Sequence, residues 1–458
     1  MTDPKLTRKR EKQQGFALLL SLIALMILAV LVTDLHETTG QGFAASMAAR
    51  DQLRAEYLAK SGVNLTRMLI GQEKNLRSLV APIFSALMKG RPPPQLPVWN
   101  FANVILEPFA NFEGSKENAA SVGFDMDLAE GLGKTGGTFE VQASAENTKM
   151  TVNDPRLQDV ALGRANIAKA IYTLTQGSPP FPSPNLYDPI FSGFDEKGRM
   201  NTRLDVLANI IDWWDADEQR TNYDPVLQAV QSSGSEDADY YRGLIEPYNI
   251  KNAPYDTLEE LRLVRGVGDD FWATFVEPDI DSPASRQITI YGGGRVNPNG
   301  ARPDVMLAAV CSFVEIRDQP LCSDPTGMER GKFIALVDMA NSMGFGIPWF
   351  SRASDFVNFV SGSGPLFEQL QPLLQTFGMP QMMFTPITIP AQPADLRRRM
   401  QRQFSTNANV LTIESTGRVG HARRTIRTVV TTDEKWTPPP PNAGKMPPLG
   451  IFSYYRID

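Results

Sequence analysis

An uninterrupted apolar run close to the amino terminus constrains this chain more than any other feature. It extends from Phe16 to Val32, and its seventeen residues carry no charge. A helix rises about 1.5 Å per residue, so this run is nearly long enough to cross a bilayer core of roughly 30 Å. The basic residues before it should stay in the cytoplasm, which places the rest of the chain on the far side. No small-residue cleavage site follows the run, so we expect a permanent single-pass anchor.

The junction at which the run begins has a recognisable form. A short basic leader ends in Gly15, and Phe16 opens the apolar helix. This junction resembles the processing site of type IV pilins and type II secretion pseudopilins. In that family a prepilin peptidase cuts after the glycine and the new amino-terminal Phe is methylated. The resemblance therefore implies that Gly15 and Phe16 are processing residues and that prepilin peptidase is a partner; the alternative is an uncut signal anchor.

One position departs from the family pattern. The fifth mature residue of these proteins is normally Glu, and this chain has Leu20 there. In the filaments the glutamate is thought to neutralise the terminal amine of a neighbouring subunit. Without that amine, a carboxylate buried among apolar helices would carry a penalty of several kcal/mol. An apolar residue suits a subunit with no neighbour above it, and the missing glutamate is typical of the large K-type minor pseudopilin.

Length and charge limit the classes of function. The chain has 458 residues, enough for two or three domains, and its net charge is −6. Phosphate binding needs a basic face, so nucleic acid is not expected as a partner. His36 and His421 are the only histidines, which leaves no histidine-based metal set and no convincing Ser-His-Asp arrangement. We therefore expect a noncatalytic protein; a carboxylate-based metal hydrolase is the remaining enzymatic alternative.

Residue periodicity predicts an α+β fold. No proline interrupts residues 34–71, so the anchor helix should continue as a long spine, with a second helical piece at about 74–89. Alternating apolar and polar residues predict strands at 136–144, 148–154, 409–416 and 422–434. We expect these strands to form one antiparallel sheet on which the long amino-terminal helix packs, as in pilins.

About 250 residues separate the first strands from the last, so the middle of the chain should be an insertion. Apolar residues recur there at intervals of three and four residues, which predicts helices. The predicted helices cover 154–174, 201–217, 256–267, 302–316 and 328–344. The expected domains are a leader at 1–15, the anchor and spine helix at 16–71, pilin-like parts at 72–153 and 396–458, and an all-helical insertion at 154–395. The last pilin-like part ends in a proline-rich tail.

Within the insertion, 252–275 resembles a helix-hairpin-helix or SAM-like unit with a tight turn at 266–268. The backbone amides of such a turn can bind phosphate, which would make the chain a DNA-binding membrane protein. Asp269 and Asp270 follow the turn, where DNA-binding versions usually carry Lys or Arg. A helical packing unit is therefore the preferred interpretation.

Carboxylates gather in the insertion at 212–239. Seven of them occur within 28 residues: Asp212, Asp215, Asp217, Glu218, Glu236, Asp237 and Asp239. Such charges repel unless they are solvated or neutralised, and Ca²⁺ accepts six to eight oxygen ligands from flexible loops. We expect Asp212, Asp217 and Glu236 to be side-chain ligands of calcium, with Asp215 and Asp237 as further candidates. The alternative is a solvated acidic loop.

The chain has two cysteines, Cys311 and Cys322. In a periplasmic protein they could pair and close a short loop. Two reduced thiols are the alternative.

Several segments of the insertion resemble the K-type minor pseudopilins of the type II (general) secretion pathway. They are DWWDADEQ, a Gly-x-Glu with a Tyr pair, YNIKNAPYDTLEELRLVRGV, and GGGRVNPNGA at 292–301. The resemblance implies a pilin-like body with a helical insertion, structural calcium in that insertion, and a place at the tip of a periplasmic pseudopilus.

The expected partners follow from the same resemblance. They are the other minor pseudopilins of the tip complex, the inner-membrane secretion platform and the inner membrane itself, with the bulk of the chain in the periplasm. The alternative within this fold is the tip minor pilin of a type IV pilus, which would act in adhesion or DNA uptake.

The mature protein should begin at Phe16, because the basic leader and Gly15 match the peptidase's pattern. Amino-terminal sequencing of protein extracted from membranes measures this directly. A terminus at Met1 or Thr2 would leave only a signal anchor.

Overall fold

A computed structural model describes residues 4–87, 91–110, 136–153, 160–176, 187–195, 197–236, 238–280, 282–315, 319–324, 326–343, 348–376, 378, 383–389, 395–432 and 450–458. The chain forms two compact units. The first consists of 1–61, 108–140 and 416–425, and the second of 62–107, 141–415 and 426–458.

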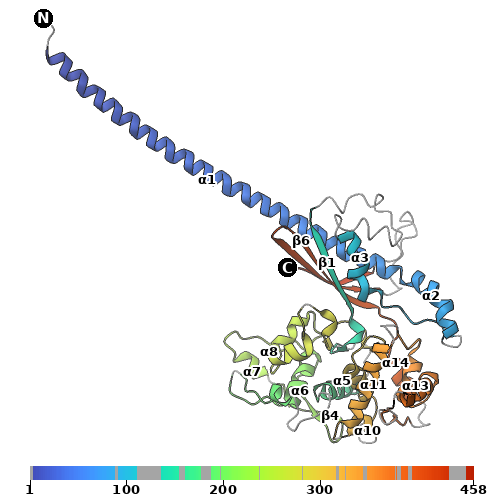
Figure 1. The fold of residues 1–458 in the computed structure, drawn as a ribbon. Helices are drawn as coiled ribbons and strands as arrows, with labels where there is room; N and C mark the ends of the chain where they lie inside the picture. Colours follow the sequence, from blue (N-terminus) through green and yellow to red (C-terminus); the bar gives the residue numbers. More distant parts are fainter. Residues whose placement is uncertain are drawn as a thin grey trace, which may run out of the picture. The chain divides into compact units, whose positions relative to one another are not determined.

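The anchor and the spine are one helix, α1 (Pro4–Gly71) (Figure 1). Every side chain from Gly15 to Val32 is exposed, as expected for a segment that meets lipid. Its part from Gly15 onward is long and apolar enough to cross a membrane. A helix satisfies its own backbone hydrogen bonds, which lipid requires of a single span. The structure thus carries one segment suited to a single-pass anchor among the residues it describes.

Small residues bring α1 close to the strand ends in the first unit. Ala55 and Ala59 of α1 are fully buried. A Cβ on Gly417 would lie 1.9 Å from the carbonyl oxygen of Ala55, and one on Gly137 would lie 2.7 Å from the Leu58 side chain. Only glycine leaves room for such an approach. The helix therefore packs against strand backbone here.

The sheet has four strands in the order β1-β6-β7-β8. They are β1 (Thr138–Ala145), β6 (Val410–Val419), β7 (Ala422–Thr431) and β8 (Ile451–Ile457). A tight turn joins β6 to β7 at Gly420, whose φ of 57° favours glycine, and β7 pairs antiparallel with β8. The long helix, the antiparallel sheet and the strands expected at 136–144, 409–416 and 422–434 are thereby confirmed.

Two strand assignments need correction. The segment 148–154 does not join this sheet: β2 (Met150–Thr151) pairs in parallel with β5 (Ile288–Thr289). A 3₁₀ turn, η4 (Glu146–Thr148), ends β1 and redirects the chain, so Met150 and Val152 enter the core of the insertion. The strand β8 was not expected, because it follows the proline-rich tail.

The insertion is mostly helical. Its longer helices are α5 (Val160–Thr175), α6 (Arg203–Trp214), α9 (Pro303–Cys311), α11 (Met328–Met343), α12 (Ala353–Val360) and α13 (Pro365–Thr376). A further helix, α14 (Asp395–Gln403), follows the insertion and precedes β6. Its short helical turns include α7 (Ala238–Arg242), η6 (Leu258–Leu263), α8 (Asp269–Phe271) and α10 (Pro320–Ser323). Before β1 the chain forms α2 (Glu73–Leu87) and α3 (Ala102–Ala110).

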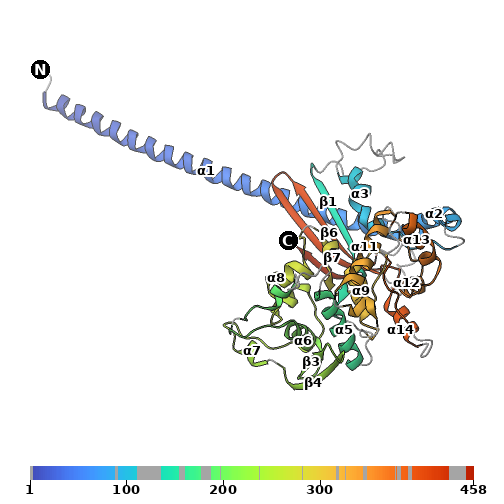
Figure 2. The same cartoon turned by 60° about the horizontal axis from the view of Figure 1, so that its bottom comes forward.

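The insertion is not purely helical, however. It also contains the hairpin β3 (Gln219–Asp224) and β4 (Ala229–Ser235), which lies beside α6 (Figure 2). This segment was expected to be an acidic loop. Its β-forming residues, such as Thr221 and Tyr223, are buried on one face of β3, so packing against α6 stabilises a strand here.

The turn at 266–268 has a packing role. Gly266 has a φ of 85°, and a Cβ on it would lie 2.5 Å from the Val206 side chain on α6. Asn209 of α6 donates a hydrogen bond to the carbonyl of Arg265 at 3.1 Å. The turn is therefore held against α6, in agreement with the helical packing unit preferred above.

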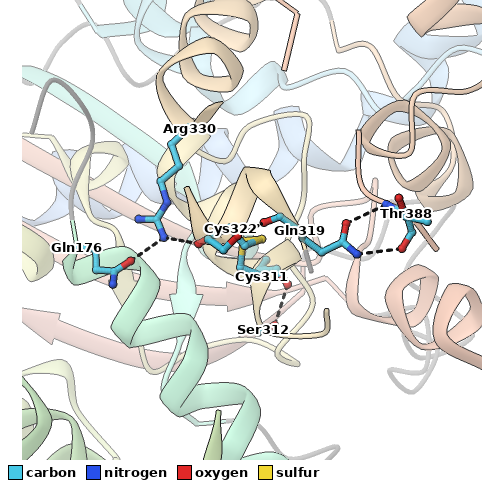
Figure 3. The surroundings of a disulfide bond; sticks show 9 residues. Gln176, Cys311, Ser312, Gln319, Cys322, Arg330 and Thr388 are labelled. Carbon is cyan, nitrogen blue, oxygen red and sulfur yellow. Dashed lines mark hydrogen bonds between the residues drawn. A yellow bond between two sulfur atoms is a disulfide. The ribbon is translucent and has the colours of Figure 1, made fainter. Parts of the chain in front are cut away.

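Cys311 and Cys322 form a disulfide in the core of the insertion (Figure 3). Cys311 ends α9 and Cys322 lies in α10, with a Cα–Cα separation of 5.7 Å. Arg330 of α11 donates to the carbonyl of Cys322 at 3.0 Å. Closing a loop this short should stabilise the fold by about 2–3 kcal/mol in the chain-entropy model. The disulfide thus ties α9 to the segment that leads into α11.

Replacing Gly417 with Ala should destabilise the packing of α1 on β6 by roughly 1–3 kcal/mol or more, because the new methyl group meets backbone that cannot rotate away. Urea unfolding of the full chain in detergent, followed by circular dichroism, measures the change. Gly193→Ala is the matched control, since nothing lies within 4 Å of a Cβ there. Equal midpoints for the two variants would contradict the close packing.

Candidate metal centre

Helix α6 positions two of the candidate carboxylates. It starts at a capping box in which Thr202 and Asp205 bond each other's backbone N–H groups, and it ends with Asp215 as the C-cap. Asp212 therefore lies in the last turn, and both carboxylates are at the carboxyl end of the helix. That end of the helix dipole is negative, so it repels anions and attracts cations.

The β3–β4 hairpin brings the third carboxylate to this helix end. Gln219 pairs with Ser235 at the open end of the hairpin, and the Glu236 N–H donates to the Glu218 carbonyl at 3.2 Å. The Asp212 Oδ1 atom accepts a hydrogen bond from the Thr221 N–H at 2.9 Å. Residues that are 24 positions apart in the sequence, Asp212 and Glu236, thus become neighbours.

Asp212, Asp215 and Glu236 form the cluster. One oxygen of each carboxylate lies within 4.8 Å of the others, and the three residues are only 3%, 1% and 7% exposed. The buried Asp215 Oδ1 and Glu236 Oε1 atoms have no hydrogen-bond partner among the described residues. Buried carboxylate oxygens normally have partners, because desolvation without compensation is costly. Two such oxygens in one cluster make it a candidate cation site.

Burial perturbs all three carboxyl groups in the same direction. Desolvation raises the pKa of Asp212 to about 6. Desolvation and the nearby Asp212 charge raise the pKa of Asp215 to about 7. Desolvation and the charges of Asp212 and Asp215 raise the pKa of Glu236 to about 8. The protein alone therefore stabilises the ionised cluster poorly at neutral pH.

One arginine offsets part of the negative charge. Arg164 of α5 lies 3.0 Å from Asp215 Oδ2 and 2.9 Å from Asp217 Oδ2. Asp217 also accepts from the Gln219 N–H at 2.9 Å. Its side chain is 39% exposed, and it is not one of the three clustered residues.

The structure gathers only some of the five predicted calcium ligands at one place. It brings Asp212, Asp215 and Glu236 together, whereas Asp217 lies at the edge of the site in an ion pair with Arg164. Asp237 lies outside the described residues.

Asn252 is a candidate that sequence reasoning missed. Its Nδ2 donates to the Asp217 carbonyl at 3.1 Å, and its amide opposes the rise in the pKa of Glu236. Its Oδ1 is buried without a hydrogen-bond partner among the described residues, and its φ of 47° is unusual for a non-glycine residue. Asn252 belongs to the YNIKNAPYD motif, which could have pointed to it, but an uncharged amide does not stand out beside seven carboxylates.

These donors suit a hard cation. The three carboxylates and the Asn252 amide oxygen offer only oxygen ligands, which Ca²⁺ prefers, and they meet at the negative end of a helix. A bound Ca²⁺ would neutralise the buried charges and join α6 to the base of the hairpin. Its role in such a place would be structural.

The chain was also compared with known proteins. No protein-family model matches it, and a search of curated proteins found no match. Among solved structures it is similar to a chain in the crystal structure of the GspK-GspI-GspJ complex from the enterotoxigenic Escherichia coli Type 2 Secretion System. The likeness covers 70% of this chain and 80% of that chain, with 12% sequence identity and a TM-score of 0.37.

Calcium should raise the melting temperature of the full chain in detergent. A ligand that binds only the folded state stabilises it by mass action, by about 2.7 kcal/mol at 100 times its Kd. Asp212→Asn should abolish the rise. Asp217→Asn is the matched control, since that carboxylate lies outside the cluster, and it should preserve the rise. Equal melting temperatures in calcium and in chelator would show that the cluster binds no calcium.

The melting temperature in chelator and the increase that calcium adds to it should change with pH in opposite directions. In chelator, stability should fall between pH 5 and pH 8, because the folded pKa values of about 6, 7 and 8 exceed those of exposed carboxyl groups. The calcium-dependent increment should instead grow over this range, because only ionised carboxylates bind the ion. Asp212→Asn should flatten both trends.

Proposed function

We propose that this chain is a noncatalytic minor pseudopilin that starts and caps the periplasmic pseudopilus of a type II secretion system. The observation that carries the proposal is α1, in which an exposed apolar segment and a spine packed on an antiparallel sheet form one continuous helix. A helix of this kind can stand in a membrane before assembly and in a bundle of like helices afterwards. Leu20, in place of the family's glutamate, supports the end position because it needs no amine from a neighbour.

The large insertion supports the same position. It interrupts the sheet between β1 and β6 and contributes most of the buried core of the second unit. So large a body would hinder a further subunit from stacking above it. We infer that the chain ends the filament and assembles there with smaller minor pseudopilins, above the inner-membrane secretion platform.

Calcium and the disulfide belong to this proposal as structural elements. We propose a Ca²⁺ ion held by Asp212, Asp215 and Glu236, with the Asn252 amide oxygen beside them. Disulfides persist in oxidising compartments such as the periplasm, and the Cys311–Cys322 pair supports that location. Both features would stabilise an insertion that folds outside the cytoplasm.

Filament length tests the proposed function. Raising the amount of this protein relative to the major pilin-like subunit should give more and shorter filaments, because each copy starts one filament and occupies its end. Electron microscopy with antibodies against the insertion measures both length and label position. Gly15→Leu, which blocks processing, is the control and should leave length unchanged. Label along the filament would contradict a tip position, and tip-labelled surface filaments that retract would indicate a type IV pilus.

A further inference from the structure

The two edges of the four-stranded sheet differ. The order β1-β6-β7-β8 makes β1 and β8 the edge strands. On β1, the Val141 N–H donates to the Asn103 side chain of α3 at 3.1 Å, so α3 caps a group that a partner strand would need. On β8, no hydrogen bond joins the main chain of residues 451–457 to anything but β7, within the part of the chain that the structure describes. Among the described residues, the β8 edge is therefore the open one.

The side chains of β8 are also unusually apolar for an edge. Ile451, Phe452, Tyr455 and Ile457 are between 39% and 43% exposed. Natural proteins usually protect edge strands with lysine, proline or an inward charge. The strand Ile451–Ile457 contains neither lysine nor proline, and its arginine, Arg456, is paired with Glu259 and Asp458. Within the described residues, the feature that blunts this edge is a bulge at Ser453, and residues 454–457 keep a regular register.

Contacts with neighbouring side chains fix the position of β8. The Arg67 guanidinium lies 4.3 Å from the Phe452 ring centroid and donates to the Gly450 carbonyl at 2.9 Å. On the other side Tyr454 contacts Tyr291 of the insertion, with ring centroids 6.1 Å apart. The strand is therefore anchored at its start and in its middle, although nothing described pairs with its outer edge. An edge of this kind is preorganised, so a partner strand would lose little freedom by adding to it.

We propose that the outer edge of β8 accepts an extended strand from a neighbouring minor pseudopilin, which adds a fifth strand to the sheet. The reason is the chemistry of the edge itself. A row of unpaired N–H and C=O groups is complementary to the main chain of an extended segment, and alternate apolar side chains such as Tyr455 and Ile457 pack on those of the incoming strand. The choice of a pilin-like partner rests on the proposed function. The strand addition rests on β8 alone.

Hydrogen exchange tests the main-chain contact. The full chain is compared in detergent alone and after co-expression with the minor pseudopilin genes of its own cluster. The outward-facing amides of 451–457 should exchange at least about tenfold more slowly in the complex, while the amides bonded to β7 should change little. A complex in which the β8 amides exchange as fast as in the free chain would overturn the strand addition and leave the proposed function intact. Failure to form any complex would instead count against the proposed function and its partner together.

A pair of variants tests the side chains. The double variant Tyr455→Lys and Ile457→Lys should weaken the complex by at least about tenfold, because charges on an edge oppose strand addition. Ile105→Lys on α3 is the matched control, with the same 41% exposure as Ile457 at the capped side of the sheet. Melting curves of the free variants show whether each still folds. Equal weakening by both, or a free chain that is dimeric through β8, would overturn the proposal.

Discussion

A buried ion pair lies where the chain leaves β1 for the insertion, and it links this point to β5 and β6. Glu146 follows β1 directly, and its carboxylate accepts from Lys149, from Thr289 of β5 and from Thr412 of β6. Both charged side chains are almost completely buried. Although burial opposes ionisation, the Lys149 charge and the three hydrogen bonds lower the pKa of Glu146. Removing one partner of such a pair typically costs about 3–5 kcal/mol, because the other charge is left buried alone. Removing either residue alone should therefore destabilise the point at which the chain leaves the sheet.

A second set of charges continues the joint between the insertion and the sheet. Arg286 is only 8% exposed and lies 2.9 Å from Glu277 and 3.2 Å from Glu414 of β6. Arg427 of β7 lies 3.8 Å from the same Glu414. Charge-assisted hydrogen bonds have narrow geometric requirements, so they add orientational specificity to apolar packing. The interior of the insertion is apolar and aromatic, so stability comes mainly from its core and orientation from this polar joint.

The periodicity of apolar residues correctly predicted those helices and strands whose structure depends mainly on neighbouring residues. The spine helix ends at Gly71 as its sequence indicated. The alternation of residues predicted β1, β6 and β7 because buried and more exposed positions alternate over part of each strand. The errors arose where partners far along the chain decide. The segment at 148–154 alternates like its neighbour, but Glu146 and Lys149 turn the chain toward β5. The β-forming residues of β8, Ile-Phe-Ser-Tyr-Tyr-Arg-Ile, were visible in the sequence, yet the prolines before them suggested an irregular tail.

At the candidate metal centre, too, the sequence could not show which residues the fold brings together. Composition located the acidic segment, but it could not rank seven carboxylates, since the ranking depends on where α6 ends and on the register of the β3–β4 hairpin. Asp215 joins the cluster because it is the C-cap of α6, and Asp217, two residues further on, turns to Arg164. Three buried carboxylates meet at the negative end of a helix, where burial, their mutual repulsion and the helix dipole all disfavour ionisation. A divalent cation at this place would offset these effects together: it would neutralise the carboxylates, offer a partner to the buried Asp215 and Glu236 oxygens, and complement the helix dipole.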